Sequence, residues 1–207
     1  MAILKLLMKG NYKITDEHCL TILKLLHDQF QDSGIPYALV GGMGVQAFLV
    51  TAGLEHLLRR SGDIDLAVCT NPTTLVQAFN QLAAANQTLR VVHDYQRQHA
   101  FIGELAVDYV SDPGKLKGME DDFYSAIKNA REICLRSVTV RVEDPEYLIA
   151  AKLTGKSFRL TDQEDIIALL KSEITINHEK VSRLSWLLPY RIEWYQEARK
   201  EFEQKRI

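Results

Sequence analysis

Two aspartates inside an otherwise apolar strand constrain this sequence more than any other feature. Asp63 and Asp65 flank Ile64, and an apolar run continues over residues 66–69. Alternate side chains of a strand share a face, so the two carboxylates project together while Ile64 and Leu66 face the core. Like charges a few ångströms apart repel, and burying them unpaired is unfavourable. The pair predicts either the solvent face of an amphipathic strand or a site that holds a compensating cation.

A strand, two glycines and a helix lie just upstream of this pair. Residues 37–41 are predicted to form a short buried strand, and residues 44–53 a helix that opens directly after Gly41 and Gly42. Glycines let a backbone approach a ligand closely, and free N–H groups at a helix N-terminus attract anions. Taken alone, the glycines also fit an ordinary tight turn. Combined with the aspartates, they indicate a phosphate site beside a metal site, where oxygen ligands favour Mg²⁺ or Mn²⁺.

A third carboxylate would complete such a metal site. Asp108 is the strongest candidate, because it lies in a later predicted strand between Val107 and Tyr109. Glu104 shares its strand face but lies near the strand start, and Asp112 lies in a turn before a proline. The six histidines are scattered without a metal-binding spacing and are interpreted as surface or partly buried residues.

The rest of the pattern predicts an α+β protein, a mixed sheet flanked by helices and followed by a C-terminal helical bundle. A helix is expected between residues 15 and 34, and others over 71–86 and 119–130. Strands are expected over 88–94, 98–103 and 104–110, and a strand or hairpin over 131–144. Four helices are expected over 145–156, 162–173, 178–189 and 191–206. We therefore predict an α/β domain over residues 1–144, N-terminal helix included, and a helical region over 145–207.

Composition narrows the class of protein. The 207 residues carry a formal net charge of −2, with 46% hydrophobic and 25% charged residues, so a sizeable core is expected without a global attraction to nucleic acid or membrane. No apolar run is long enough to span a bilayer, and the start does not resemble a signal peptide. The three cysteines are scattered and expected to be buried thiols. We expect a cytoplasmic protein with no membrane partner. The last helix mixes basic and acidic residues, Arg191 and Arg199 among them, and is expected to present a solvated, salt-bridged face.

Gly41-Gly42, the helix after them and Asp63-Ile64-Asp65 together resemble the polymerase-β-type nucleotidyltransferase superfamily, and Asp108 matches its third carboxylate. Residues 58–66, LRRSGDIDL, are similar to the AbiEii/AbiGii toxin-like branch, as is the later stretch 144–170. The first half is also similar to aminoglycoside and lincosamide nucleotidyltransferases. One departure is that no hydroxyl residue follows Gly42, which removes a side-chain contact to phosphate.

The resemblance implies a metal-dependent transfer of a nucleoside monophosphate from a nucleoside triphosphate to an acceptor hydroxyl. Mg²⁺ or Mn²⁺ would be held by the three aspartates, with Asp108 beside the attacking group. The positions that would bind the nucleotide are Gly41, Gly42, Arg59, Ser61 and Lys152. From the residues alone, Arg59 also fits a solvated basic corner, and Lys152 a lysine at the edge of an apolar helix face.

The stretch 144–170 carries three further positions that match the toxin-like branch: Arg159, Asp162 and Asp165. Asp162 fits a helix N-cap as well as a site residue, and Asp165 fits a residue that orients Lys152.

Three functions fit the sequence. The first is an active nucleotidyltransferase acting on RNA or a protein, as toxin-like relatives do, with an antitoxin protein as a possible partner. The second is the same chemistry on a small hydroxylated molecule such as an antibiotic. The third is a non-catalytic nucleotide-binding regulatory protein that keeps the fold. The three aspartates argue against the third, and the near-neutral charge argues mildly against extensive RNA contact.

Overall fold

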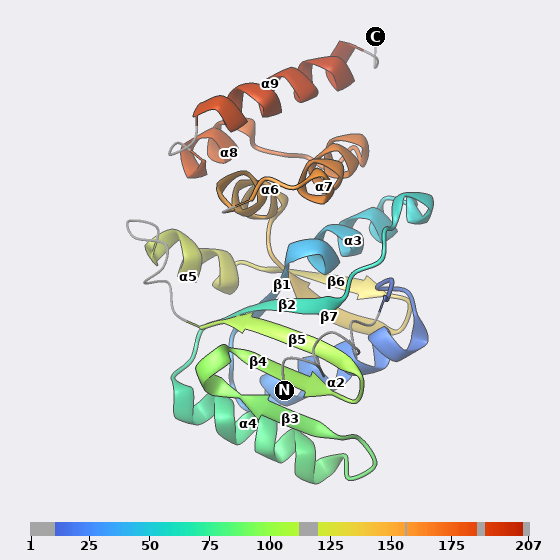
Figure 1. The fold of residues 1–207 in the computed structure, drawn as a ribbon, viewed down its shortest axis with the longest axis vertical. Coiled ribbons are helices and arrows are strands. Elements are labelled where there is room, and N and C mark those ends of the chain that lie inside the picture. The colour runs from blue at the N-terminus through green and yellow to red at the C-terminus, as the bar shows by residue number, and fades with distance from the viewer. Residues whose placement is uncertain (1–10, 112–119, 156, 186–188, 205–207) are drawn as a thin grey trace.

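A computed structural model describes residues 11–111, 120–155, 157–185 and 189–204 of the chain (Figure 1). The helices are α2 (Glu17–Asp32), α3 (Gly41–Thr51), α4 (Pro72–Ala85), α5 (Glu120–Lys128), α6 (Pro145–Thr154), α7 (Leu160–Lys171), α8 (His178–Leu184) and α9 (Pro189–Gln204), with two short 3₁₀ turns, Glu55–Leu57 and Tyr95–Arg97. The strands are β1 (Tyr37–Val40), β2 (Asp63–Val68), β3 (Val91–Asp94), β4 (His99–Ile102), β5 (Leu105–Val110), β6 (Arg131–Leu135) and β7 (Val138–Val142).

The strands form one mixed sheet in the order β3-β4-β5-β2-β1-β7-β6. β2 lies near the middle, antiparallel to β1 and parallel to β5. The predicted strand or hairpin over residues 131–144 is a hairpin, β6 and β7, and β7 runs parallel to β1. The mixed sheet with flanking helices confirms the predicted α+β class.

Helices cover both faces of the sheet (Figure 1). α2 and α4 pack on one face, where Leu20, Leu23, Leu26 and Phe30 of α2 are buried at helical spacing. α3 and α5 lie on the other face, and Phe123 of α5 packs there with Ala67 of β2. α6 and α7 pack above α3, so α3 is enclosed between the sheet and the C-terminal helices. Because Ala67 shares its strand face with Asp63 and Asp65, this second face carries the aspartate pair.

Local sequence signals explain several element boundaries. Asn71 caps α4 by accepting a hydrogen bond from the Thr74 N–H at 2.9 Å, and Pro72 begins the helix. α3 begins at Gly41 rather than after Gly42, so both glycines form its first turn. Gly41 has a φ of +60°, a backbone conformation that glycine adopts without steric strain. The predicted division at Asp144-Pro145 coincides with the start of α6, although a division into two domains stays a prediction.

Two expectations about side chains are wrong. Arg191, expected on a solvated face, is buried with 7% exposure, although Arg199 does pair with Glu203 on the surface of the same helix. Cys134 is exposed, and only Cys19 of the three cysteines is fully buried. Two other carboxylates ranked below Asp108 as metal ligands. Glu104 is an exposed residue of the turn between β4 and β5, and Asp112 lies outside the described residues.

None of the described helices combines the length and the apolar character that crossing a bilayer requires.

Candidate functional site

The aspartates lie on neighbouring strands in matched positions. Asp65 of β2 is the direct partner of Asp108 on β5 and of Val40 on β1. Ile64 and Leu66, which point to the opposite face, are fully buried, as their alternation with the aspartates predicted. The strand register thus places Asp65 and Asp108 side by side, with Asp63 one step along β2 on the same face.

The three carboxylates converge. One oxygen from each of Asp63, Asp65 and Asp108 lies within 4.8 Å of the others, and all three residues are half-buried. The Ser61 hydroxyl donates a hydrogen bond to Asp63 Oδ1 at 3.2 Å, and Ser61 is itself fixed by paired backbone hydrogen bonds to Tyr12. Such a cluster of hard oxygen ligands fits a divalent cation such as Mg²⁺ or Mn²⁺.

The electrostatics of the cluster show why it needs a cation. Burial raises the pKa of Asp65 to about 7, with the negative charges of Asp63 and Asp108 adding to the effect and Lys152 opposing it. A carboxylate surrounded in this way is held ionised most simply by a bound positive charge. The donor set and its electrostatics therefore both fit a metal.

The first turn of α3 packs directly against Asp65. A Cβ placed on Gly41 would lie only 2.1 Å from Asp65 Oδ2, so the site has no room for a side chain there. A Cβ on Gly42 would lie 2.6 Å from an Arg59 guanidinium nitrogen. Val40, the N-cap residue of α3, provides no side-chain cap. Gly41 and Gly42 line the cavity beside the carboxylates, and the first N–H groups of α3 have no side-chain cap, as an anion site requires.

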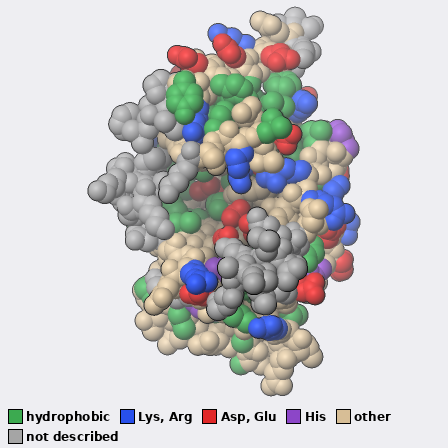
Figure 2. Space-filling view, in the orientation of Figure 1, with side chains coloured by type: hydrophobic (Ala, Val, Ile, Leu, Met, Phe, Trp, Pro, Cys, Tyr) green, Lys and Arg blue, Asp and Glu red, His purple; other side chains and the backbone are tan. Residues whose placement is uncertain are grey.

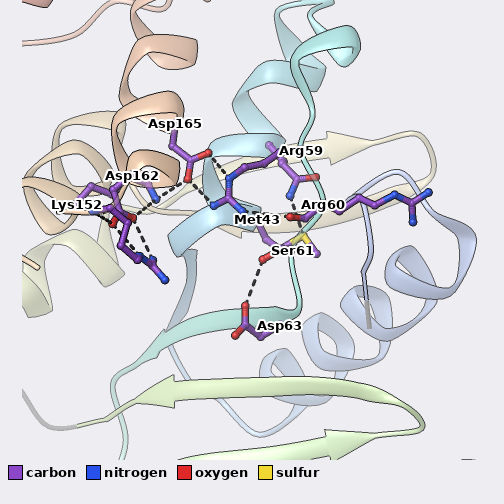
Figure 3. A network of polar contacts seen from close by, with 10 residues as sticks. Met43, Arg59, Arg60, Ser61, Asp63, Lys152, Asp162 and Asp165 are labelled. Carbon is purple, nitrogen blue, oxygen red and sulfur yellow. Dashed lines mark hydrogen bonds and ion pairs between the residues drawn. The ribbon is translucent and has the colours of Figure 1, made fainter. Parts of the chain in front are cut away.

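A network of ion pairs links the chain before β2 to the C-terminal helices (Figure 3). Arg59 donates two hydrogen bonds to Asp165 of α7, at 2.7 and 2.6 Å, and these bonds raise the pKa of Arg59. Lys152 of α6 lies 2.6 Å from the same carboxylate and 3.5 Å from Asp162. The Lys152, Asp162 and Asp165 side chains are each no more than 7% exposed. The Asp165 carboxylate thus binds both Arg59, from the chain before β2, and Lys152, from α6.

Arg159 is a cavity residue beyond those that the sequence assigned to the nucleotide. Its guanidinium donates to Asp162 at 3.0 and 3.2 Å while the side chain stays 66% exposed. Burial opposes the ionisation of Asp162, but the Arg159 hydrogen bonds and the Lys152 charge outweigh it and lower its pKa. Asp162 is the third residue of α7, not its N-cap; its carboxylate accepts the Arg159 N–H in a capping box. Arg159 therefore offers an exposed positive charge above the aspartates.

All of the predicted site residues line one cavity of about 850 Å³. Its lining has three carboxylates on the sheet, those of Asp63, Asp65 and Asp108, and a fourth, that of Asp162, on α7. The cations lie mainly on the rim opposite the sheet and are Arg59, Arg60, Lys152 and Arg159. Figure 2 shows acidic side chains in a hollow near the middle of the molecule, with basic side chains on the surface above it. A metal would be held on the sheet side, and a polyanion on the helix side.

His99 also belongs to this site, contrary to the expectation that the histidines are scattered surface or partly buried residues. It lies on β4 directly beside Asp108, is 8% exposed, and its Nδ1 contacts Asp108 Oδ1. Its position on a strand next to an aspartate strand was visible in the sequence. The register that pairs it with Asp108 was not.

Comparison with solved structures identifies the fold. The chain is similar to an antigenic nucleotidyltransferase-like protein from Paracoccidioides brasiliensis, with a TM-score of 0.61 and 15% identity over 91% of this chain and 95% of that one. It is also similar to the antibiotic-resistance factor ANT(2'')-Ia, with a TM-score of 0.55 and 16% identity over 90% of this chain and 99% of that one. The chain therefore has the nucleotidyltransferase fold. No family model matches the sequence, and neither does any curated protein.

Proposed function

We propose that this protein is a metal-dependent nucleotidyltransferase, which moves a nucleoside monophosphate from a nucleoside triphosphate to an acceptor hydroxyl. The single observation that carries the proposal is the convergence of Asp63, Asp65 and Asp108 beside the first turn of α3. The opposite cationic rim supports it, because a metal-bound triphosphate presents positive charge on one side and negative charge on the other. The fold that the chain shares with nucleotidyltransferase-like structures also supports the proposal.

Each part of the site has a chemical task in this proposal. Asp63, Asp65 and Asp108 would hold Mg²⁺ or Mn²⁺, which when bound neutralises triphosphate charge and acidifies the acceptor hydroxyl. The N–H groups of Gly41 and Gly42 would orient phosphate oxygens. Ser61 fixes the Asp63 carboxylate by its hydrogen bond.

Positive charge for the phosphates comes from two differently placed groups. Lys152 is held at the cavity wall by Asp165, as expected if Asp165 orients it, and its charge already acts on Asp65. Arg159 pairs with the buried Asp162 but keeps a side chain that is 66% exposed, so it can also reach a ligand in the cavity. Arg59 already donates two hydrogen bonds to Asp165. We therefore propose that it mainly fixes the shape of the site and contributes less to binding phosphate.

The acceptor is the less constrained part of the proposal. RNA or protein acceptors, and an antitoxin partner, follow from the resemblance to the toxin-like branch alone. A cavity of about 850 Å³ falls within the usual range of small-molecule sites, about 300–1,000 Å³. The antibiotic-resistance factor among the similar structures favours the same alternative. A small hydroxylated acceptor is therefore our second candidate, and a non-catalytic nucleotide-binding protein is the third.

The test is incubation of the protein with each α-labelled nucleoside triphosphate, Mg²⁺, and either cell RNA, protein or a small-molecule extract. We expect label in one acceptor class and pyrophosphate as the second product. Asp63→Asn should lower this turnover by a factor of about 10³ or more, because the metal loses a ligand while the side chain keeps its shape. Asp32→Asn, at the exposed end of α2 and outside the cavity, is the matched control and should keep full activity. Undiminished transfer by Asp63→Asn would contradict the proposed metal role.

A further inference from the structure

One row of residues crosses five strands of the sheet and contains a buried histidine. The successive direct partners are Val40 on β1, Asp65 on β2, Asp108 on β5, His99 on β4 and Asp94 on β3. Direct partners in a sheet present their side chains to the same face. His99 therefore extends the aspartate row by one strand and lies against the outer side of Asp108.

The contacts of His99 fix how its ring is used. Nδ1 contacts Asp108 Oδ1, and the ring packs edge-on against Phe101, with 4.4 Å between the ring centroids and 83° between the planes. A carboxylate can only accept hydrogen bonds, so Nδ1 carries the proton whenever Asp108 is ionised. The hydrogen bond ties up one oxygen of Asp108 and limits its rotation, so the other oxygen has a defined direction.

The surroundings of the second ring nitrogen, Nε2, argue against a role of His99 in proton transfer. Nε2 is buried and has no hydrogen-bond partner among the described residues. A proton passed from Asp108 into the ring would have no onward acceptor at Nε2. The arrangement fits a fixed donor rather than a proton relay. Burying a ring nitrogen without a hydrogen-bond partner is unfavourable, so we expect the hydrogen bond at Nδ1 to offset this cost.

From this geometry we infer that His99 is a positioning residue that locks one oxygen of Asp108 and thereby aims the other at the metal. The inference deepens the proposed function and rests on it. Ser61 does the same for Asp63 from the other end of the cluster, so both Asp63 and Asp108 are held by a side chain outside the triad. Residues of this kind commonly change metal affinity by about 10–100-fold when they are removed.

Three substitutions at His99 separate the possible roles. His99→Asn places an amide N–H close to the position of Nδ1 and so keeps the donor. His99→Phe keeps a ring against Phe101 but removes the donor. His99→Gln moves the amide toward the position of Nε2. Mn²⁺ affinity is measured by electron paramagnetic resonance, turnover with the labelled triphosphate, and folding by thermal unfolding of the metal-free protein.

We expect His99→Phe to weaken Mn²⁺ binding about tenfold or more and to lower turnover in parallel, while His99→Asn recovers Mn²⁺ affinity to within about threefold of wild type. His99→Gln should resemble His99→Phe. Equal Mn²⁺ affinity in wild type and His99→Phe would overturn the inference. Loss of turnover in a folded His99→Asn with full Mn²⁺ affinity would also overturn it, because an ionisable ring would then be needed.

Wild type and Asp63→Asn, measured in the same series, separate this inference from the proposed function. If wild type binds Mn²⁺ but transfers no nucleotide, the transferase proposal fails, and the His99 variants still decide the positioning role by their Mn²⁺ affinities. If wild type and Asp63→Asn bind Mn²⁺ equally poorly, there is no metal site and both ideas fail.

Discussion

At the residue scale, Gly41 in the first turn of α3 has no side chain, and the Asp65 carboxylate occupies the space that a side chain would take. Gly41 combines a positive φ with a position where a Cβ would lie 2.1 Å from Asp65 Oδ2. Gly53 has a similar φ of +70°, but a Cβ there would meet nothing within 4 Å. A side chain at either glycine would strain the backbone, because both have a positive φ. Only at Gly41 would a side chain also clash with a neighbouring residue.

This pair allows a controlled experiment. Gly53→Ala should cost about 1–2 kcal/mol of unfolding free energy through backbone strain alone. Gly41→Ala should cost more, and it should also weaken Mn²⁺ binding at least about tenfold, because its methyl group displaces the Asp65 carboxylate. Urea unfolding and Mn²⁺ titration of both variants make the comparison. Equal behaviour of the two alanines would show that the approach to Asp65 has no functional meaning.

We expect Lys152 to contribute both to the stability of the fold and to nucleotide binding. From the sequence, Lys152 is either a nucleotide-binding residue or a lysine at the edge of an apolar helix face. The structure adds a role in stability, because Lys152 is buried between Asp162 and Asp165. Lys152→Met should lower the unfolding free energy by about 3 kcal/mol, since one partner of a buried ion pair is removed. Nucleotide affinity, measured by calorimetry with Mg²⁺, should fall by about 1.5–3 kcal/mol.

Lys24→Met is the matched control for stability. Lys24 pairs with Asp28 on the exposed surface of α2, and its loss should cost less than about 1 kcal/mol. Unchanged nucleotide affinity in a folded Lys152→Met protein would leave Lys152 a purely structural residue.

At the scale of elements, one buried guanidinium links α9 to the end of α6. Arg191 of α9 donates to the carbonyl oxygens of Leu153 and Gly155, each at 2.6 Å, where α6 ends. These carbonyls have no partner within the helix, and a positive charge at a helix C-terminus is favourable. The Arg191 guanidinium also lies 5.3 Å from the centre of the Phe158 ring, between α6 and α7.

Arg191→Met should therefore lower the unfolding free energy by about 2–4 kcal/mol, because the carbonyls of Leu153 and Gly155 lose a charged donor. Arg199→Met, on the same helix, removes only the exposed pair with Glu203 and should change stability by less than about 0.5 kcal/mol. Chemical unfolding of both variants tests this. A similar small loss in both would mean that α9 is not fastened through Arg191.

These elements show which parts of the molecule a sequence can predict. The alternation of β2 placed Asp63 and Asp65 on one face and Ile64 in the core, because strand periodicity is local. The Asn71 cap and the helical spacing of α2 are local in the same way. The pairing of His99 with Asp108 depends on strand register, and that of Arg59 with Asp165 joins residues 106 positions apart. Arg191 has a surface-like sequence context and is buried because α9 packs on α7 and the Arg191 side chain reaches the end of α6. Such contacts arise from tertiary packing, which no local pattern specifies.

At the scale of the whole molecule, the junction between the sheet and the C-terminal helices contains a buried acid. Glu143 follows β7, is 6% exposed, and its N–H donates to the Leu39 carbonyl of β1. Burial raises the pKa of Glu143 to about 8; the neighbouring Asp144 carboxylate adds to the shift and the Lys180 ammonium opposes it. In the folded protein the side chain is therefore neutral over much of the range in which an unfolded glutamate is charged.

The sign of the resulting pH dependence follows from linkage. The folded state binds a proton that the unfolded state has released, so this contribution to stability is fully present below pH 4.5 and is lost as the pH rises to about 8. Glu143→Gln removes the ionisation and keeps the shape. We expect the variant to exceed wild type in unfolding free energy by roughly 1–3 kcal/mol at pH 8, with little difference at pH 4.5. Glu197→Gln, at an exposed position of α9, is the control and should follow wild type at both pH values. A stability difference between wild type and Glu143→Gln that stays constant from pH 4.5 to 8 would mean that Glu143 is not the group whose proton couples the junction to folding.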